Sequence, residues 1–193
     1  MQFIVFDYNK TFIVLIYSIK MNKFYQKVND PGKRMVLYEF LPPETHTTRK
    51  ALVNDAITLV KDIVGYRKDL DALLVPKIID ESERGINITR PDRLDARTFA
   101  AYIRQNDPNN TEIVISYPFR SIIPKEKTEE WIRKTAHEYH IGNIIVVGPA
   151  KDRADLTGYS VNEVLKKIQT LNSQDITNIC AGAICIDKRR KID

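Results

Sequence analysis

The chain has 193 residues and a formal net charge of +5, with 43% hydrophobic and 28% charged residues. These values are typical of a globular domain that is long enough to bury a core. The positive charge is modest, and no dense basic run with interleaved aromatic residues argues for nucleic-acid binding, although local basic clusters could attract an anionic ligand.

The first part of the chain, residues 1–33, differs from the remainder. Two apolar runs, Phe3–Phe6 and Thr11–Tyr17, flank a polar turn, which predicts a hairpin of two strands. The longest apolar run is too short to span a bilayer, and no basic start or small-residue cleavage site indicates a secretory signal. Because Met21 opens a more ordinary polar leader, we interpret residues 1–20 as a non-native or upstream-start extension.

The first strand of the main part is predicted at Arg34–Leu41. This short apolar run is followed by two prolines, which lack the N–H that a β-ladder needs, and it predicts a buried strand. Glu39 lies inside it. A carboxylate is costly to bury in an apolar strand unless it is paired or used. At the carboxyl end of a strand in an α/β barrel, Glu39 would project into the mouth of the active site.

The remainder of the chain alternates between predicted helices and strands. The first helix is capped by Thr45 or Thr47 and ends at Gly65. Further strands are predicted at Ala72–Pro76, Glu112–Tyr117, Asn143–Gly148 and Asn178–Ile186, and further helices begin after Asp95, at Pro124 and after Ser160. Strands that are apolar on both faces and alternate with helices predict a parallel sheet flanked by helices.

This pattern fits either a doubly wound open sheet or part of a (β/α)8 barrel. No glycine-rich phosphate-binding motif follows any strand, which argues against a dinucleotide-binding doubly wound fold.

The motif Tyr38-Glu39-Phe40-Leu41-Pro42-Pro43 resembles the opening strand of the methylenetetrahydrofolate reductase family, where the pattern is roughly Phe-Glu-Phe-Phe-Pro-Pro. The resemblance extends over about residues 34–190. Asn143–Gly148 is similar to the family's fourth strand, Gly158–Val161 to the loop that follows, Ile179–Ile186 to its fifth strand, and Val75–Gly85 to a divergent branch.

The resemblance implies a TIM-type (β/α)8 barrel, with only about five β/α units present in residues 34–193. It implies flavin-dependent reduction of methylene-tetrahydrofolate or a related pterin carrier in the cytoplasm, with FAD supplying the hydride and Glu39 the proton. Such a proton donor requires an apolar surrounding that favours its protonated form.

Further site residues follow from the same resemblance. Gly148, Tyr159 and Ser160 are expected at the flavin, although a loop tyrosine and a helix cap are the alternatives for the last two. Lys77 and Asp80 follow the second strand and are expected at the substrate, or else in a salt-linked loop.

The chain departs from the family in two respects. Where the family's fourth strand ends in Arg-Gly-Asp, this chain has Gly148-Pro149-Ala150, so that only Asp152 or Asp155 could replace the acid, if the loop bends. About three strands are missing, and five strands cannot close an eight-stranded barrel. We therefore expect a truncated product, half of a split protein, or a subunit that pairs with a copy of itself or a second chain. The unpaired edge at the fifth strand could be covered by the N-terminal hairpin.

Two other activity classes remain open. The chain could be a non-catalytic partner subunit with the same fold, or a ligand-binding α/β module without redox activity. No metal site is predicted, because His137 and His140 fit a solvated helix end. Cys180 and Cys185 are an odd number of residues apart, so that on one strand they face opposite sides as buried thiols.

Overall fold

The computed structural model describes residues 3–7, 11–15, 23–30, 32–64, 70–78, 92–107, 110–148 and 157–186. Several residues discussed above lie outside this described part of the chain, so their predicted roles have no structural counterpart here. They are Met21, Gly65, Asp80, Gly85, Pro149, Ala150, Asp152 and Asp155.

Five parallel strands form the main sheet, in the order in which they occur along the chain. They are β3 (Leu37–Glu39), β4 (Ala72–Pro76), β5 (Glu112–Tyr117), β6 (Asn143–Val146) and β7 (Cys180–Ala183). This confirms the predicted α/β fold with a parallel sheet. A doubly wound sheet reverses its strand order at one point, and no reversal occurs among these five strands.

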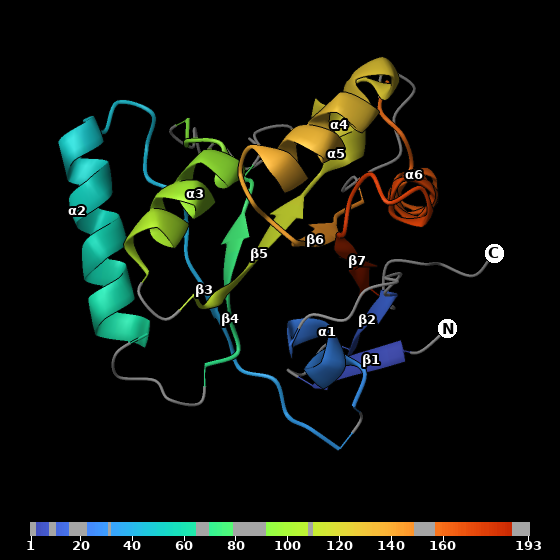
Figure 1. The fold of residues 1–193 in the computed structure, drawn as a ribbon, viewed down its shortest axis with the longest axis horizontal. Helices are drawn as coiled ribbons and strands as arrows, with labels where there is room; N and C mark the ends of the chain where they lie inside the picture. Colours follow the sequence, from blue (N-terminus) through green and yellow to red (C-terminus); the bar gives the residue numbers. More distant parts are fainter. Residues whose placement is uncertain are drawn as a thin grey trace, which may run out of the picture.

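Helices connect the strands. They are α2 (Arg49–Leu59), continued by a π-helix at Val60–Val64; α3 (Ala96–Asn106); α4 (Phe119–Ile122), a 3-10 turn at Lys125–Lys127 and α5 (Thr128–His137); and α6 (Val161–Ser173). Figure 1 shows α2, α3, α5 and α6 following one another across the sheet. Within the described residues, none of these helices combines the length and apolar character that crossing a bilayer demands.

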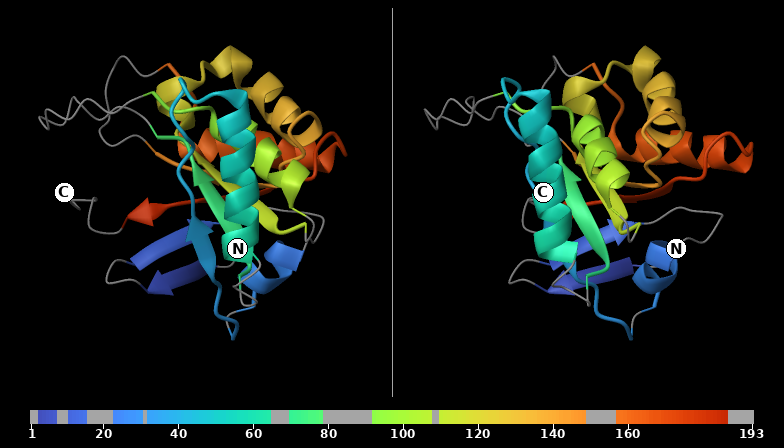
Figure 2. Two further views of the ribbon diagram at one scale, coloured as in Figure 1. Left: turned by 90° about the vertical axis from the view of Figure 1, so that its left-hand side faces the viewer. Right: turned by 60° about the vertical axis from the view of Figure 1, so that its left-hand side comes forward.

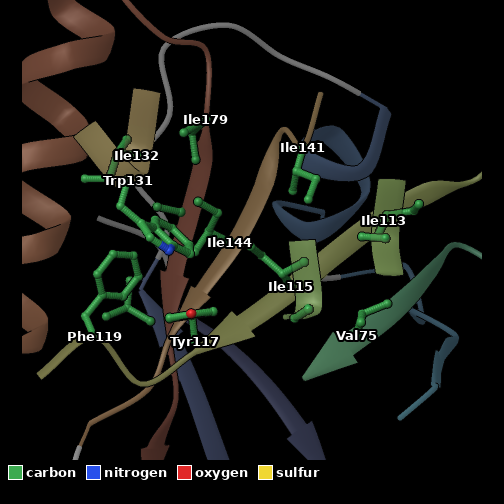
Figure 3. Close-up of a cluster of buried hydrophobic side chains, with 14 of the residues drawn as sticks. Val75, Ile113, Ile115, Tyr117, Phe119, Trp131, Ile132, Ile141, Ile144 and Ile179 are labelled. Atoms are coloured by element: carbon green, nitrogen blue, oxygen red, sulfur yellow. The ribbon is translucent and has the colours of Figure 1, made fainter. Parts of the chain in front are cut away.

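One face of the sheet packs against all of these helices, and we call it the helix-layer face. Because side chains alternate along a strand, Val75, Ile115 and Ile144 share this face and lie in the main buried cluster. Figure 3 shows this cluster, in which α4 and α5 contribute Phe119 and Trp131, with ring centroids 4.6 Å apart. The main core therefore lies between the sheet and the helices.

The opposite face carries a second, smaller cluster. Phe24 and Val28 of α1 (Lys23–Val28) are buried against Ala72 and Val114 of the sheet. We call this side of the sheet the α1 face. Figure 2 shows α1 away from the layer of the other helices, near the beginning of the green β4 strand.

Asp71 fixes α1 at the amino end of β4. Its carboxylate forms an ion pair with Lys27 of α1 and accepts a hydrogen bond of 2.8 Å from the backbone N–H of Val36. Since Asp71 directly precedes β4, α1 covers the part of the α1 face where the strands begin.

The predicted N-terminal hairpin is present. β1 (Phe3–Asp7) pairs antiparallel with β2 (Thr11–Leu15), and β2 pairs in turn with β8 (Cys185–Ile186). The prediction of one strand over Asn178–Ile186 was therefore wrong, because the chain leaves the parallel sheet after β7 and joins the hairpin in a separate sheet. The hairpin pairs with this continuation and not with β7 itself.

The first strand also differs from its prediction. β3 is only three residues long and lies at an edge of the sheet, with Tyr38 and Glu39 exposed, so that the predicted buried strand was wrong. The helix cap is Thr48, whose hydroxyl oxygen accepts from the N–H of Ala51, and neither Thr45 nor Thr47. Thr45 instead donates its backbone N–H to Asp92, which holds it in the loop.

Candidate functional site

Glu39, the predicted proton donor, lies on the α1 face of the edge strand. It stands in one cross-strand row with Leu74, Val114, Asn143 and Cys180. Its side chain is exposed, so within the described residues it does not have the apolar enclosure that the proposed role requires. Glu39 therefore needs a further group beside it if it is to act as an acid.

The next row on the same face, two residues further along the strands, consists of Pro76, Ser116, Ile145 and Gly182. Pro76 and Ser116 are buried, whereas Ile145 and the neighbouring Leu74 are only partly buried. Gly182 is also buried. We call this second row, together with Leu74 and Glu39, the carboxyl half of the α1 face. Most of its residues are buried, and its accessible part consists of the partly buried Leu74 and Ile145 and the exposed Glu39, close to the carboxyl ends of the strands.

Lys77 and Gly148 lie further along the strands and on the other side. Lys77 extends the β4 ladder by donating its N–H to Ser116 O (2.8 Å), so strand alternation places it on the helix-layer face. It follows Leu74, the partner of Glu39, by three residues, or about 10 Å of strand. A Cβ atom at Gly148 would lie 3.4 Å from the Val161 side chain of α6, which also places Gly148 on the helix side. The structure thus does not gather these residues around Glu39.

The segment Gly158–Ser160 is held by α4 and α6. The N–H of Gly158 donates to Arg120 O (3.3 Å), and the Tyr159 ring carries Lys125 Nζ 5.4 Å above its centroid. Ser160 caps α6, because its hydroxyl accepts from Glu163 N–H while the Glu163 carboxylate accepts from Ser160 N–H (2.8 Å). Ser160 and Tyr159 therefore already have structural roles, as the alternatives to flavin binding anticipated.

A polar cluster that the sequence did not reveal joins α3, β5 and α5. Tyr117, the last residue of β5, donates its hydroxyl to Asp95 (2.9 Å), and Asp95 also accepts from the side chain of Arg97 (2.9 Å). Arg97 in turn lies over the rings of Trp131 and Tyr139, at 4.5 and 4.8 Å from their centroids. The predicted cap role of Asp95 is confirmed, since it also accepts from Arg97 N–H. The contacts with Tyr117, Trp131 and Tyr139 could not be predicted, because they depend on which elements are neighbours in the folded structure.

The ionisation of this cluster reflects its burial. Burial and the adjacent Asp95 charge raise the pKa of Tyr117, so the phenol stays protonated and acts as a hydrogen-bond donor. For Asp95, burial raises the pKa, but hydrogen bonds and charge from Arg97 outweigh burial, and Tyr117 adds to them, so the pKa is lowered overall. The cluster therefore consists of the Asp95 carboxylate and its two donors, Tyr117 and Arg97. We interpret it as a structural arrangement on the helix-layer face.

The remaining candidates have simple environments. Cys180 is buried, as predicted, and burial raises the pKa of its thiol to about 12, which makes it an unreactive thiol. The side-chain surroundings of Cys185 lie outside the described part. His137 Nε2 is 2.8 Å from Ile176 O. In the described ranges, no group of three or more His, Cys, Asp or Glu side chains is placed to hold a metal ion.

No protein-family model matches this chain, and a comparison with curated proteins finds no significant match.

Proposed function

We propose that this chain is a flavin-dependent, methylenetetrahydrofolate reductase-like protein that acts on a methylene-tetrahydrofolate or related pterin carrier, with Glu39 as the proton donor. The observation that carries the proposal is the position of Glu39 beside Leu74 on the carboxyl half of the α1 face. An aromatic ring system needs a flat apolar surface, and a proton donor must lie at its rim.

The strand order supports a barrel-type architecture. Parallel strands in chain order, with α2–α6 on a single face, are the arrangement of consecutive (β/α) units in a barrel. In a barrel the helix-free face is the interior, and its carboxyl end forms the active site. The α1 face takes this place here, with α1 filling its amino end. The proposal thus assigns the ligand to the part of that face that α1 does not cover.

The residues present fit a flat ring system. Leu74 and Ile145 are partly buried, so they retain some apolar surface. When bound, FAD would supply the hydride. Glu39 would hold a proton and deliver it to the ring nitrogen of the pterin, which opens the methylene bridge for reduction. Because Glu39 is exposed, the bound ring system itself would have to keep water away from that proton.

A second candidate is a ligand-binding or partner subunit without redox activity. The exposure of Glu39, and the placement of Lys77 and Gly148 on the helix side, favour it. Such a protein would bind a flat ligand on the same surface without transferring a proton, so binding and turnover must be measured separately.

The test is a flavin titration followed by a turnover assay. We expect saturable quenching of FAD fluorescence by the full chain and loss of that quenching in Ile145→Lys, because the new charge lies on the ligand surface. Glu39→Gln is expected to bind flavin normally but to lose about 100-fold or more in turnover of methylene-tetrahydrofolate, the usual range for a general acid. Glu126→Gln, an exposed carboxylate on the 3-10 turn, is the matched control.

Three outcomes separate the candidates. Binding with unchanged turnover in Glu39→Gln removes Glu39 from its role. Binding without any turnover by the unmodified chain supports the non-catalytic subunit. Absence of binding for both FAD and FMN contradicts the flavin proposal.

A further inference from the structure

The outer edge of β3 has a specific pattern of backbone groups. Val36 O accepts from Asp71 N–H (2.9 Å), and Phe40 N–H donates to Leu74 O (2.8 Å), so these residues direct their groups towards β4. Backbone groups of successive strand residues point to opposite sides of the strand. Leu37 and Glu39 therefore direct their N–H and C=O groups away from β4, along an edge where the described residues place no further strand.

The same edge carries exposed apolar side chains. Tyr38 and Leu41 are 42% and 44% exposed, and they are the large hydrophobic residues that stand out as exposed in the described part of the chain. Native proteins usually protect an edge strand with charges, prolines or bulges. Here the edge carries one charge, the exposed Glu39, and the prolines at 42 and 43 begin only after Leu41, so the outward backbone groups of β3 remain open to pairing.

From this pattern we infer that β3 pairs antiparallel with β3 of a second copy of this chain, about a two-fold axis at Tyr38. In this register Leu37 lies opposite the partner's Glu39, and each such pair can exchange two backbone hydrogen bonds through the outward groups. Tyr38 then faces the partner's Tyr38 as the closer, non-hydrogen-bonded pair.

The register also covers the second exposed side chain. Leu41 comes to lie opposite the partner's Met35, and both belong to the α1 face by strand alternation. A two-fold axis at Leu37 instead would place Leu41 opposite the partner's Lys33 and would separate the two tyrosines. A two-fold axis at Glu39 would also cover Tyr38 and Leu41, but it would place two carboxylates directly opposite each other, which is destabilising. The register at Tyr38 covers both exposed apolar residues without that repulsion.

This dimer has a consequence for Glu39, although it does not depend on the proposed function. The partner's Leu37 and Met35 extend the α1 face beyond the edge strand, so that Glu39 gains an apolar neighbour that the single chain lacks. The ten strands of two copies would form one continuous sheet, with the two copies of Glu39 in diagonal positions about 7–8 Å apart.

Cysteine cross-linking in the full chain tests the register. Tyr38→Cys places two thiols on directly opposite positions, whereas Glu39→Cys, one residue away and equally on the exposed edge, places them diagonally. A disulfide needs Cβ atoms about 3.5–4.5 Å apart. We expect oxidation to cross-link Tyr38→Cys at least about tenfold faster than Glu39→Cys, since the diagonal distance is about 7–8 Å. The unmodified chain, with its two cysteines, gives the background.

Sedimentation velocity provides an independent measurement. The unmodified chain is expected to show a concentration-dependent species of twice 22.3 kDa. Tyr38→Lys should remain monomeric, because it places two charges opposite each other. Gln105→Lys adds the same charge on the exposed side of α3 and should dimerise normally. A chain that is monomeric at all concentrations, or equal cross-linking of the two cysteine variants, would overturn the inference.

Discussion

At Gly158 the chain passes so close to α4 that a single methyl group does not fit. A Cβ atom there would lie 2.6 Å from the carbonyl oxygens of Phe119 and Ile123, and 2.7 Å from the Cα of Arg120. These are backbone atoms, which cannot rotate away as the end of a side chain can. The glycine therefore allows the segment that leads into α6 to lie directly against the short helix.

We predict that Gly158→Ala destabilises the protein substantially more than Gly148→Ala. The first substitution forces backbone apart, and overpacking of this kind costs about 1–3 kcal/mol or more. At Gly148 the nearest contact for a Cβ is 3.4 Å, to a methyl group of Val161, which is an ordinary van der Waals distance, so the cost should be below about 1 kcal/mol. Urea denaturation of both variants measures the difference, and equal midpoints would contradict this account of Gly158.

At the level of elements, the cluster of Asp95, Arg97 and Tyr117 joins parts of the chain that meet only in the folded state. The Asp95 side chain is 27% exposed and Arg97 15%, so the ion pair is partly shielded from water. Its hydrogen bonds connect the beginning of α3 to the end of β5, and the Arg97 guanidinium continues the contact to Trp131 of α5. The cluster thus fixes the relative positions of three elements.

The stability conferred by Asp95 should depend on pH. Its pKa is lowered in the folded state, so its ionised form contributes stability above the ordinary aspartate value of about 3.9, and this contribution is lost as pH falls through the lower folded-state value. We predict that Asp95→Asn, which keeps the cap shape, is less stable by about 1–3 kcal/mol at pH 7. The gap to the unmodified chain should narrow as the pH falls towards 2.

Urea denaturation between pH 2 and 7 measures this gap. Glu130→Gln is the control, because that carboxylate pairs with Lys134 on an exposed helix surface and should contribute little. A gap that stays constant across the pH range would show that the Asp95 charge is not what stabilises the fold.

The alternation of apolar strands and amphipathic helices predicted the main sheet well, because each element's pattern is local. β4, β5 and the cap of α3 fall where the sequence placed them. The exposure of β3 could not be predicted in this way, because it depends on whether another strand lies beyond it. The sequence pattern of an apolar strand is the same whether the strand lies at the centre or at the edge of a sheet.

The candidate site was predictable only in part. The motif drew attention to Glu39, but its row partners, from Leu74 to Cys180, follow from the registers of four strand pairs. The same holds for Tyr117 and Asp95, which are 22 residues apart. Nothing in the sequence indicates that these two polar residues are in contact, because their contact depends on how α3 packs against β5.

At the level of the whole molecule, the N-terminal hairpin forms a sheet separate from the five parallel strands. The hairpin pairs with β8, which has left the parallel sheet. The five-stranded sheet with its helices is therefore one part of the fold, and the N-terminal hairpin is a second part that is attached to it through β8.

We therefore predict that a chain starting at Met21 keeps the parallel sheet and its helices. Its far-ultraviolet circular dichroism should retain the helical signal, and thermal unfolding should remain a single cooperative transition, with a modest loss of stability from the unpaired β8. The full chain measured in parallel is the reference. A broad, non-cooperative transition in the shortened chain would show that the hairpin is required for the core.

The order of the strands also has a consequence for synthesis. A chain that leaves the ribosome amino end first presents β3, β4, β5, β6 and β7 one after another, and each strand finds its neighbour already made. No strand of this sheet has to wait for a partner later than its neighbour or insert between two others, so each pairing closes the crossover of one β/α unit and not a loop that spans the chain. The exception is β2, which is made early and meets β8 only when nearly all of the chain has emerged. The parallel sheet can therefore grow during translation, whereas the hairpin pairs with β8 only at the end.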